Sequence, residues 1–345
     1  MRNQRKAAQH EKMKSRDSDK TSRFPLPTSP KSCLSLSKIH SDGVLVVDKP
    51  AGISSAGMVA HVKKLLGAKK LGHAGTLDPF ATGVLVCCVN QGTRLARFFL
   101  HGEKRYEAVL ELGIETDTQD LTGTVTSKSE DTDFDERTIR EIFERFQGEI
   151  RQHPPVYSAL KHEGTPLYKL ARQGKAVQKP PRQVFISHLR IIDIKLSEIR
   201  FETVCSGGTY IRTLAADIGT ALGCGAHLKS LRRLESSGFS IREAQFINRY
   251  PTELEERKQN LEIISMAHAL RGMPKYVADE LLGRKIKHGT PLTGKDISLK
   301  TDSEVSEALP VFVKVTDAEN NLLAVLTPAG ESGKYKYCCV FHGQG

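Results

Sequence analysis

The chain has 345 residues and a formal net charge of +11. Its length suffices for a large core and a second small domain, and its charge suits a polyanionic partner, although a ribosomal or membrane-surface protein would share that charge. The 7 cysteines include no Cys-x-x-Cys spacing, which argues against a zinc site and a disulfide framework and favours a reducing cytoplasm. No apolar stretch is long enough for a secretory signal or a membrane span.

The beginning of the chain differs in composition from the rest. Residues 1–40 carry ten Lys and Arg against three acidic residues, with three prolines and almost no apolar periodicity. This composition predicts a disordered basic tail, and its acidic residues argue against a transit peptide.

Short apolar runs and helical stretches follow from residue 41 onward. Residues 44–47 and 84–89 predict buried strands, and residues 106–112 predict a third strand that leads into a turn-rich stretch. Residues 135–147 place four apolar side chains at helical spacing, which indicates a helix packed on the core.

The second half of this region continues the mixed pattern. Residues 189–194 and 199–204 predict a pair of strands, and an apolar stripe over residues 211–222 predicts a helix that ends at Gly223. Strands and helices in this order indicate an α+β domain over residues 41–270.

A small β-rich module is predicted over residues 273–345. Residues 311–316 and 322–326 flank a polar turn and form a clear hairpin signal, and residues 340–341 can add a last strand. Such a module can bind a ligand or simply pack against the larger domain.

A basic insert, defined here as residues 151–182, is the strongest outlier of composition inside the large domain. It holds seven basic residues and one acid, together with Tyr157, Tyr168 and two Pro-Pro pairs. Basic side chains neutralise phosphates and aromatic rings offer stacking faces, which is how proteins engage looped RNA. An ordinary solvated insertion fits the charge equally well.

The segment from Gly72 to Gly83 presents one carboxylate in a rigid turn. Pro79 fixes its own φ and favours an extended Asp78, and three glycines allow sharp bends and close approach of another backbone. An acid held in this way is suited to act as a reagent. An isolated Asp-Pro pair is also common in ordinary turns.

Further motifs decide between these two interpretations. They follow one another along the chain at residues 43–55, 104–106, 207–212 and 231–234. Together with the Asp78 segment they resemble the TruB family of tRNA pseudouridine synthases, of the bacterial type, over about residues 41–250. The resemblance implies the pseudouridine synthase fold, with a mixed, mainly antiparallel sheet, flanking helices and an active cleft across the sheet. It also implies a C-terminal domain akin to the PUA module and a role of the insert in gripping tRNA.

The activity implied by the resemblance is the isomerisation of uridine 55 in the tRNA T loop to pseudouridine. The base is flipped out of its stack, and an aspartate-dependent rearrangement breaks and remakes the glycosidic bond. We expect no cofactor, no metal, no membrane contact and no obligate protein partner or guide RNA, and we expect a cytoplasmic monomer. The carboxylate can act as a nucleophile or as a base at C2′, and the sequence leaves both routes open.

Three residues are implied to carry the chemistry. Asp78 is the carboxylate, and Arg212 is its ion-pair partner in a largely dry pocket. Tyr106 stacks on the flipped uracil, and its phenol can assist removal of the proton from C5.

Other residues are implied to contact the substrate, namely His73, Tyr210, Leu231, Lys49, Lys161 and Arg232. Several have a simpler interpretation. Tyr210 and Leu231 can equally be packing residues, and His73 can be an ordinary loop histidine. Lys49 is better placed to brace the catalytic turn than to react. Lys229, Arg232 and Arg233 are expected to extend the basic surface of the insert.

Two other functions remain open at this point. One is a guide-RNA-dependent catalytic subunit, against which the sequence of residues 223–228 and the large basic insert argue. The other is an RNA-binding or chaperone protein without essential catalysis, which the intact set of Asp78, Tyr106 and Arg212 disfavours.

Overall fold

The computed structural model describes residues 41–248, 261–297, 312–329 and 333–342. The predicted basic tail over residues 1–40 lies outside these ranges. In the described part of the chain, no helix combines the length and the apolar character needed to span a membrane.

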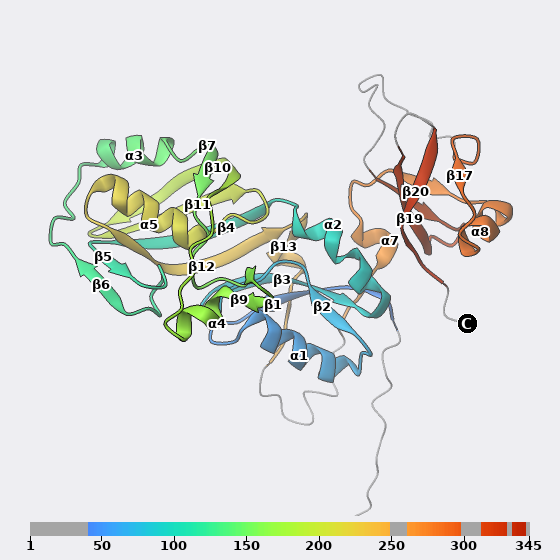
Figure 1. Cartoon of the computed structure of the whole chain (residues 1–345), viewed down its shortest axis with the longest axis horizontal. Coiled ribbons are helices and arrows are strands. Elements are labelled where there is room, and N and C mark those ends of the chain that lie inside the picture. The colour runs from blue at the N-terminus through green and yellow to red at the C-terminus, as the bar shows by residue number, and fades with distance from the viewer. Residues whose placement is uncertain (1–40, 249–260, 298–311, 330–332, 343–345) are drawn as a thin grey trace, which may run out of the picture. The chain divides into compact units, whose positions relative to one another are not determined.

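One large sheet dominates the first domain (Figure 1). Its main path runs through β14 (Gln245–Phe246), β1 (Gly43–Lys49), β3 (Thr82–Val89), β12 (Ala226–Ser236), β4 (Lys104–Leu112), β11 (Glu198–Cys205), β10 (Arg182–Lys195) and β7 (Gly148–Gln152). Three short strands pair beside this path, namely β2 (Leu71–His73), β13 (Phe239–Ser240) and β15 (Ile264–Ser265). Among these described strands the β1–β14 and β3–β12 pairs are parallel and the rest antiparallel, which confirms the expected mixed, mainly antiparallel sheet.

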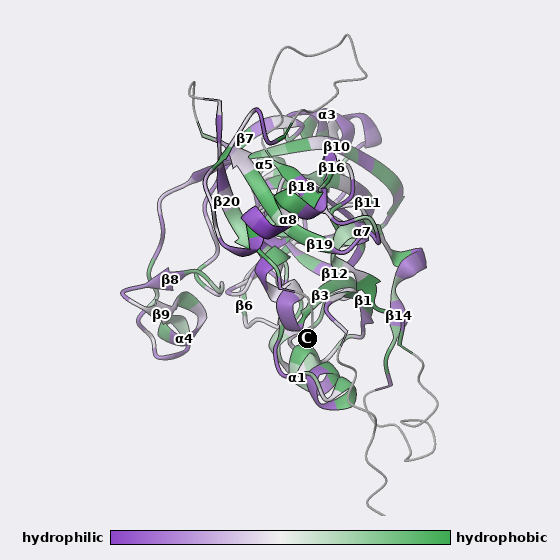
Figure 2. Cartoon of the chain, turned by 90° about the vertical axis from the view of Figure 1, so that its right-hand side faces the viewer, coloured by the Kyte–Doolittle hydropathy of each residue, from purple (hydrophilic) through white to green (hydrophobic). Residues whose placement is uncertain are grey.

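The apolar run in β1 is buried on both faces of the sheet. Leu45 and Val47 pack with helix α1 (Ser55–Leu66), whereas Val44 and Val46 belong to a cluster on the opposite face that includes Phe99 of α2 (Ala96–Leu100). A strand covered on both sides needs such an unbroken apolar run, because successive side chains alternate between the faces. Figure 2 shows hydrophobic colour along the strands, while α1 carries both colours.

Helices α3 (Glu136–Glu144) and α5 (Ile211–Leu222) cover the half of the sheet formed by β4, β10, β11 and β12. The rings of Phe143 on α3 and Phe201 on β11 meet edge to face, 5.6 Å apart. Gly223 adopts a left-handed conformation at the end of α5, as its position predicts. The predicted helix over 135–147 is present but ends earlier, at Glu144.

The basic insert leaves the sheet at the end of β7 and returns at the start of β10. Between these points it forms β8 (Lys161–His162), β9 (Thr165–Pro166) and α4 (Leu167–Arg172). The turn-rich stretch after β4 contains the hairpin of β5 (Ile114–Thr116) and β6 (Val125–Lys128).

The C-terminal module has a sheet and a core of its own. Its strands run in the order β16 (Lys275–Val277), β18 (Val313–Thr316), β19 (Leu322–Pro328), β20 (Lys334–Val340) and β17 (Leu292–Thr293), with helix α8 (Glu280–Lys287) packed on them. The predicted hairpin is therefore present as β18 and β19. The short helix α7 (Met266–Ala269) precedes this module.

Close approach of β3 and β12 makes a testable prediction at Gly83. A Cβ there would lie 2.2 Å from the Arg233 carbonyl oxygen, and the backbone has φ +101°. Gly148 has a similar φ of +86° but open space around it. We expect Gly83→Ala to lower the free energy of unfolding by about 2–5 kcal/mol and Gly148→Ala by about 1–2 kcal/mol, because only the first adds a clash. Urea unfolding followed by circular dichroism measures both, and equal effects would contradict the clash.

Candidate active site

The loop between β2 and β3 holds Asp78 by fixing its two neighbours. The buried Ser55 hydroxyl accepts the Leu77 N–H and donates to the Leu77 carbonyl, each over 2.8 Å. On the other side, the Gly52 N–H donates to the Pro79 carbonyl over 2.8 Å. The main chain is thus tied before and after Asp78, which presents the carboxylate in one place.

Lys49 lies behind the same turn and is fully buried. Its ammonium donates to the carbonyls of Pro50 and Ile53 at 2.8 Å and of Pro79 at 3.3 Å. Burial lowers the pKa of Lys49 to about 8, against the opposing charge of Asp78. Lys49 braces the turn, as its position beside Pro50 suggests, and its contact with the substrate stays a prediction.

Arg233 braces the loop from the β12 side. Its guanidinium donates to the carbonyls of Val84 at 2.7 Å, Gly75 at 3.1 Å and Thr76 at 3.4 Å. The residue is 1 % exposed, so the expectation that it extends the basic surface is wrong. Neighbouring strand residues face opposite sides of a sheet, which turns Arg233 inward.

Asp78 and Arg212 form the central ion pair of the site. Arg212 Nε lies 2.9 Å from Asp78 Oδ2, and Nη2 lies 3.4 Å from Oδ1. The Arg212 side chain is 4 % exposed, while 32 % of the Asp78 side chain remains open to solvent. The pair therefore has a buried cation and an acid that an incoming molecule can reach.

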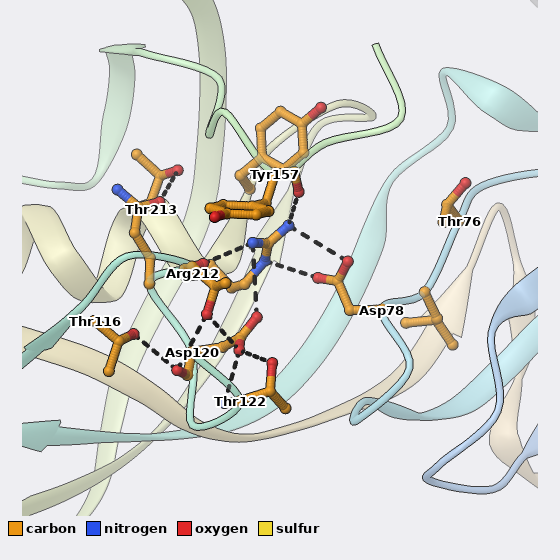
Figure 3. Close-up of polar contacts among 12 residues, drawn as sticks. Thr76, Asp78, Thr116, Asp120, Thr122, Tyr157, Arg212 and Thr213 are labelled. Atoms are coloured by element: carbon orange, nitrogen blue, oxygen red, sulfur yellow. Dashed lines mark hydrogen bonds and ion pairs between the residues drawn. The ribbon is translucent and has the colours of Figure 1, made fainter. Parts of the chain in front are cut away.

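Three further acceptors fix the Arg212 guanidinium (Figure 3). Nη1 donates to the Thr118 carbonyl at 2.7 Å, and Nη2 donates to the Tyr157 carbonyl at 2.9 Å. Nη1 also lies 3.6 Å from Asp120 Oδ2. One guanidinium thus joins the Asp78 loop, the turn after β5 and the basic insert.

Asp120 is a second carboxylate that the sequence analysis missed. It is 6 % exposed, and its Oδ1 accepts the Thr118 hydroxyl at 2.8 Å, the Thr122 N–H at 2.9 Å and the Thr122 hydroxyl at 2.6 Å. Because an Asp with Thr and Gly two and three residues later is ordinary turn chemistry, its sequence surroundings conceal this contact.

The environment of Asp78 raises its pKa above the ordinary value. Burial is the largest cause and the negative charge of Asp120 adds to it, whereas Arg212 and Lys49 oppose it. Arg212 therefore favours the ionised form of the acid, in a setting whose burial favours the protonated form.

Tyr106 stands on β4, next to the loop that carries Asp78. It is buried in the same cluster as Leu77 and Leu231, and it pairs across the sheet with Arg233. Burial raises the pKa of the phenol, while the Arg233 cation opposes the shift. The structure thus brings Tyr106 and Leu231 together beside the acid, with Tyr106 as a neutral phenol at neutral pH.

Tyr210 precedes α5, two residues before Arg212. The Arg182 guanidinium lies 4.7 Å above the centre of its ring. His73 lies half-buried on β2, and burial lowers its pKa, which leaves a neutral imidazole.

The two basic residues predicted to contact substrate lie in different surroundings. Lys161 is exposed on β8, inside the insert. Arg232 is half-exposed on β12, where its guanidinium pairs with Asp48 over 2.7 Å. In the described part of the chain, no three His, Cys, Asp or Glu side chains are placed to hold a metal ion.

Comparison with known proteins places this geometry in a family. The model of the N-terminal domain of TruB family pseudouridylate synthases matches residues 63–211, and that of the tRNA pseudouridylate synthase B C-terminal domain matches residues 212–255. A relative from Syntrophotalea carbinolica, tRNA pseudouridine synthase B, is 42 % identical over 264 residues, which are 76 % of this chain and 86 % of the relative. The chain belongs to the TruB family.

Other members and solved structures agree with this assignment. The TruB protein of Bordetella parapertussis, also named tRNA pseudouridine synthase B, is 47 % identical over 205 residues, 59 % of this chain and 84 % of the relative. The crystal structure of a Cbf5-Nop10-Gar1 complex contains a chain with a TM-score of 0.62 and 26 % identity, covering 85 % of this chain and 80 % of that one. The present TruB protein is therefore a pseudouridine synthase, an isomerase with the expected fold.

The ion pair makes a prediction about pH. Arg212→Lys keeps one charge but cannot hold both Asp78 oxygens and the carbonyls of Thr118 and Tyr157. The lysine therefore lowers the pKa of Asp78 less than the arginine does, and that pKa is higher in the variant. On the prediction that the ionised Asp78 is the reactive form, activity should disappear as pH falls through that pKa. We expect the acidic limb of the rate profile to move up by about one pH unit. The rate of pseudouridine formation is measured against pH for wild type, Arg212→Lys and the surface control Arg200→Lys. An acidic limb at the same pH in wild type and Arg212→Lys would contradict the prediction.

Proposed function

We propose that this TruB protein isomerises uridine 55 in the T loop of tRNA to pseudouridine, alone and without a guide RNA. The observation that carries the proposal is the Asp78 carboxylate, partly open to solvent and held by a buried Arg212 at 2.9 Å. The relatives named tRNA pseudouridine synthase B support tRNA as the substrate.

The reaction is balanced without any external donor. The bond from N1 to C1′ breaks, the detached uracil turns, and C5 forms the new bond to C1′, while the C5 proton leaves and N1 gains one. An ionised Asp78 serves this sequence either by attack on the sugar or base, or by taking a proton from C2′. Both routes need an acid that approaches the sugar and stays deprotonated, which the Arg212 contact favours.

The target uridine has to leave its stack to reach Asp78. Flipping costs a few kcal/mol, which contacts in the pocket offset. Tyr106 would stack on the flipped uracil, and Leu231 and Tyr210 would form walls of the same pocket. His73, a neutral imidazole at the loop entrance, would support the displaced loop bases.

The basic insert would hold the T arm outside the pocket. Lys161 is exposed there, and Arg172 lies 5.7 Å above the Tyr168 ring, so cationic and aromatic surfaces occur together. We also propose that the C-terminal module adds affinity for tRNA. Every described cysteine is a free thiol, which suits a protein working in a reducing cytoplasm, and we propose that it acts there as a monomer.

A guide-dependent subunit is the second candidate, because the solved neighbours include a Cbf5-Nop10-Gar1 complex and an archaeal box H/ACA sRNP Nop10-Cbf5 complex. Activity of the isolated protein on a bare transcript distinguishes the two candidates.

The first experiment follows tritium release from a T-arm stem-loop that carries tritium at uracil C5, without guide RNA. Wild type should release tritium, whereas Asp78→Asn should lose turnover and keep RNA binding nearly intact, because only the reactive carboxylate is removed. Asp193→Asn, on the surface, is the matched control. Release by Asp78→Asn above about 1 % of wild type would contradict its role, since removal of an essential reactive group costs several orders of magnitude.

Tyr106→Phe separates stacking from proton transfer. The ring remains, so RNA affinity should change little, while the single-turnover rate should fall about 10²-fold if the phenol assists removal of the C5 proton. A rate equal to wild type would reduce Tyr106 to a stacking platform. Rapid-quench tritium release with excess enzyme measures this rate.

A further inference from the structure

The insert joins the sheet at one rung of its hydrogen-bonded ladder. Gln152 is the last residue of β7 and Arg182 the first of β10, and the two are direct partners across the strands. This rung is where the main chain of the insert is hydrogen-bonded into the large sheet. Both of its side chains turn to the same neighbouring segment, residues 208–210.

The Gln152 side chain is fully buried and makes two hydrogen bonds to one residue. Its Oε1 accepts the Tyr210 N–H at 2.9 Å, and its Nε2 donates to the Tyr210 carbonyl at 3.0 Å. That carbonyl is also the first acceptor of α5, bound by the Leu214 N–H at 3.0 Å. Tyr210 is the N-cap residue of α5, but its own side chain makes no capping hydrogen bond. The side-chain amide of Gln152 fixes the backbone where α5 begins.

Arg182 also contacts residues 208–210. Its guanidinium stacks over the Tyr210 ring and donates to the Gly208 carbonyl. Just before this segment, the Ser206 N–H donates to the Phe185 carbonyl on β10 at 2.8 Å. These contacts fix the start of α5 to the root of the insert.

Arg212 lies two residues further along α5 and is tied to the insert a second time, through the Tyr157 carbonyl at 2.9 Å. We propose that Gln152 is a positioning residue, which couples the placement of the insert to Arg212 and hence to Asp78. The proposal rests on the proposed function, because it assumes that the insert holds the RNA whose uridine is isomerised.

Gln152→Met tests the coupling, since it keeps the length of the side chain and removes both hydrogen bonds. The matched control is Gln183→Met, an exposed neighbour on β10 whose amide contacts Glu149. At saturating T-arm RNA we expect Gln152→Met to lower the single-turnover rate about tenfold, with the RNA Kd changed less than about threefold. Gln183→Met should match wild type in both.

Gln152→Glu separates positioning from mere stability. A protonated glutamic acid can still accept the Tyr210 N–H and donate to its carbonyl, whereas a carboxylate repels that carbonyl. A buried carboxyl group titrates well above its ordinary range. The rate of Gln152→Glu relative to wild type should therefore rise about fivefold or more as pH falls from about 8.5 to 5.5, while the relative rate of Gln152→Met stays flat. Circular dichroism at each pH verifies folding.

Several results would overturn the proposal. They are a Gln152→Met rate within twofold of wild type, a loss of RNA affinity as large as the loss of rate, or a flat relative rate for Gln152→Glu. If wild type and Gln183→Met both release no tritium, the proposed substrate is wrong instead. Amide hydrogen exchange at Tyr210 then decides the coupling in the protein alone, where exchange should be faster in Gln152→Met than in Gln183→Met, and equal exchange would refute it.

Discussion

The Arg212 guanidinium is the contact on which the site depends. It joins the Asp78 loop, the turn containing Thr118 and Asp120, and the Tyr157 carbonyl of the insert, three segments far apart in the sequence. Burying a cation is costly unless its donors are satisfied, and here carboxylates and carbonyls together satisfy them. A planar, five-donor group suits this task, and an ammonium does not.

Two further buried cations support the same loop. Lys49 and Arg233 both donate to backbone carbonyls around Asp78. Carbonyl dipoles solvate these charges and leave the Asp78 oxygens to Arg212 and to solvent. The rigidity of the acid and its raised pKa thus have a common origin in the burial of the surrounding loop.

Much of the fold can be predicted from local sequence patterns, because apolar runs in strands and apolar stripes on helices mark the residues that are buried. The strand at 44–47, the stripe at 211–222 and the C-terminal hairpin are all present. β10 begins at Arg182, well before the predicted 189–194, because the basic, proline-rich sequence before it obscures the strand pattern. The assignment of roles to Asp78, Tyr106 and Arg212 came from family resemblance, and those roles stay proposals.

The parts that could not be predicted depend on long-range pairing. Nothing local distinguishes Arg233, which faces the core, from Arg232, which faces outward, until the register of β12 is known. The sequence around Asp120 is that of a turn residue, and its contact with Arg212, 92 positions later, appears only in the folded structure.

The single rung at the root of the insert has a consequence for how such enzymes diversify. Because Gln152 and Arg182 face each other across adjacent strands, the chain between them starts and ends at a fixed spacing. Lengthening a surface loop closed in this way costs little, since closure entropy grows only slowly with length. A longer segment placed after Tyr157 would thus leave the sheet and the Arg212 contact unchanged, and, on the proposed role of the insert, it would change the RNA shape that the enzyme accepts. Variation of this kind is confined to the part of the insert that leaves the Gln152–Arg182 rung and the Tyr157 contact in place.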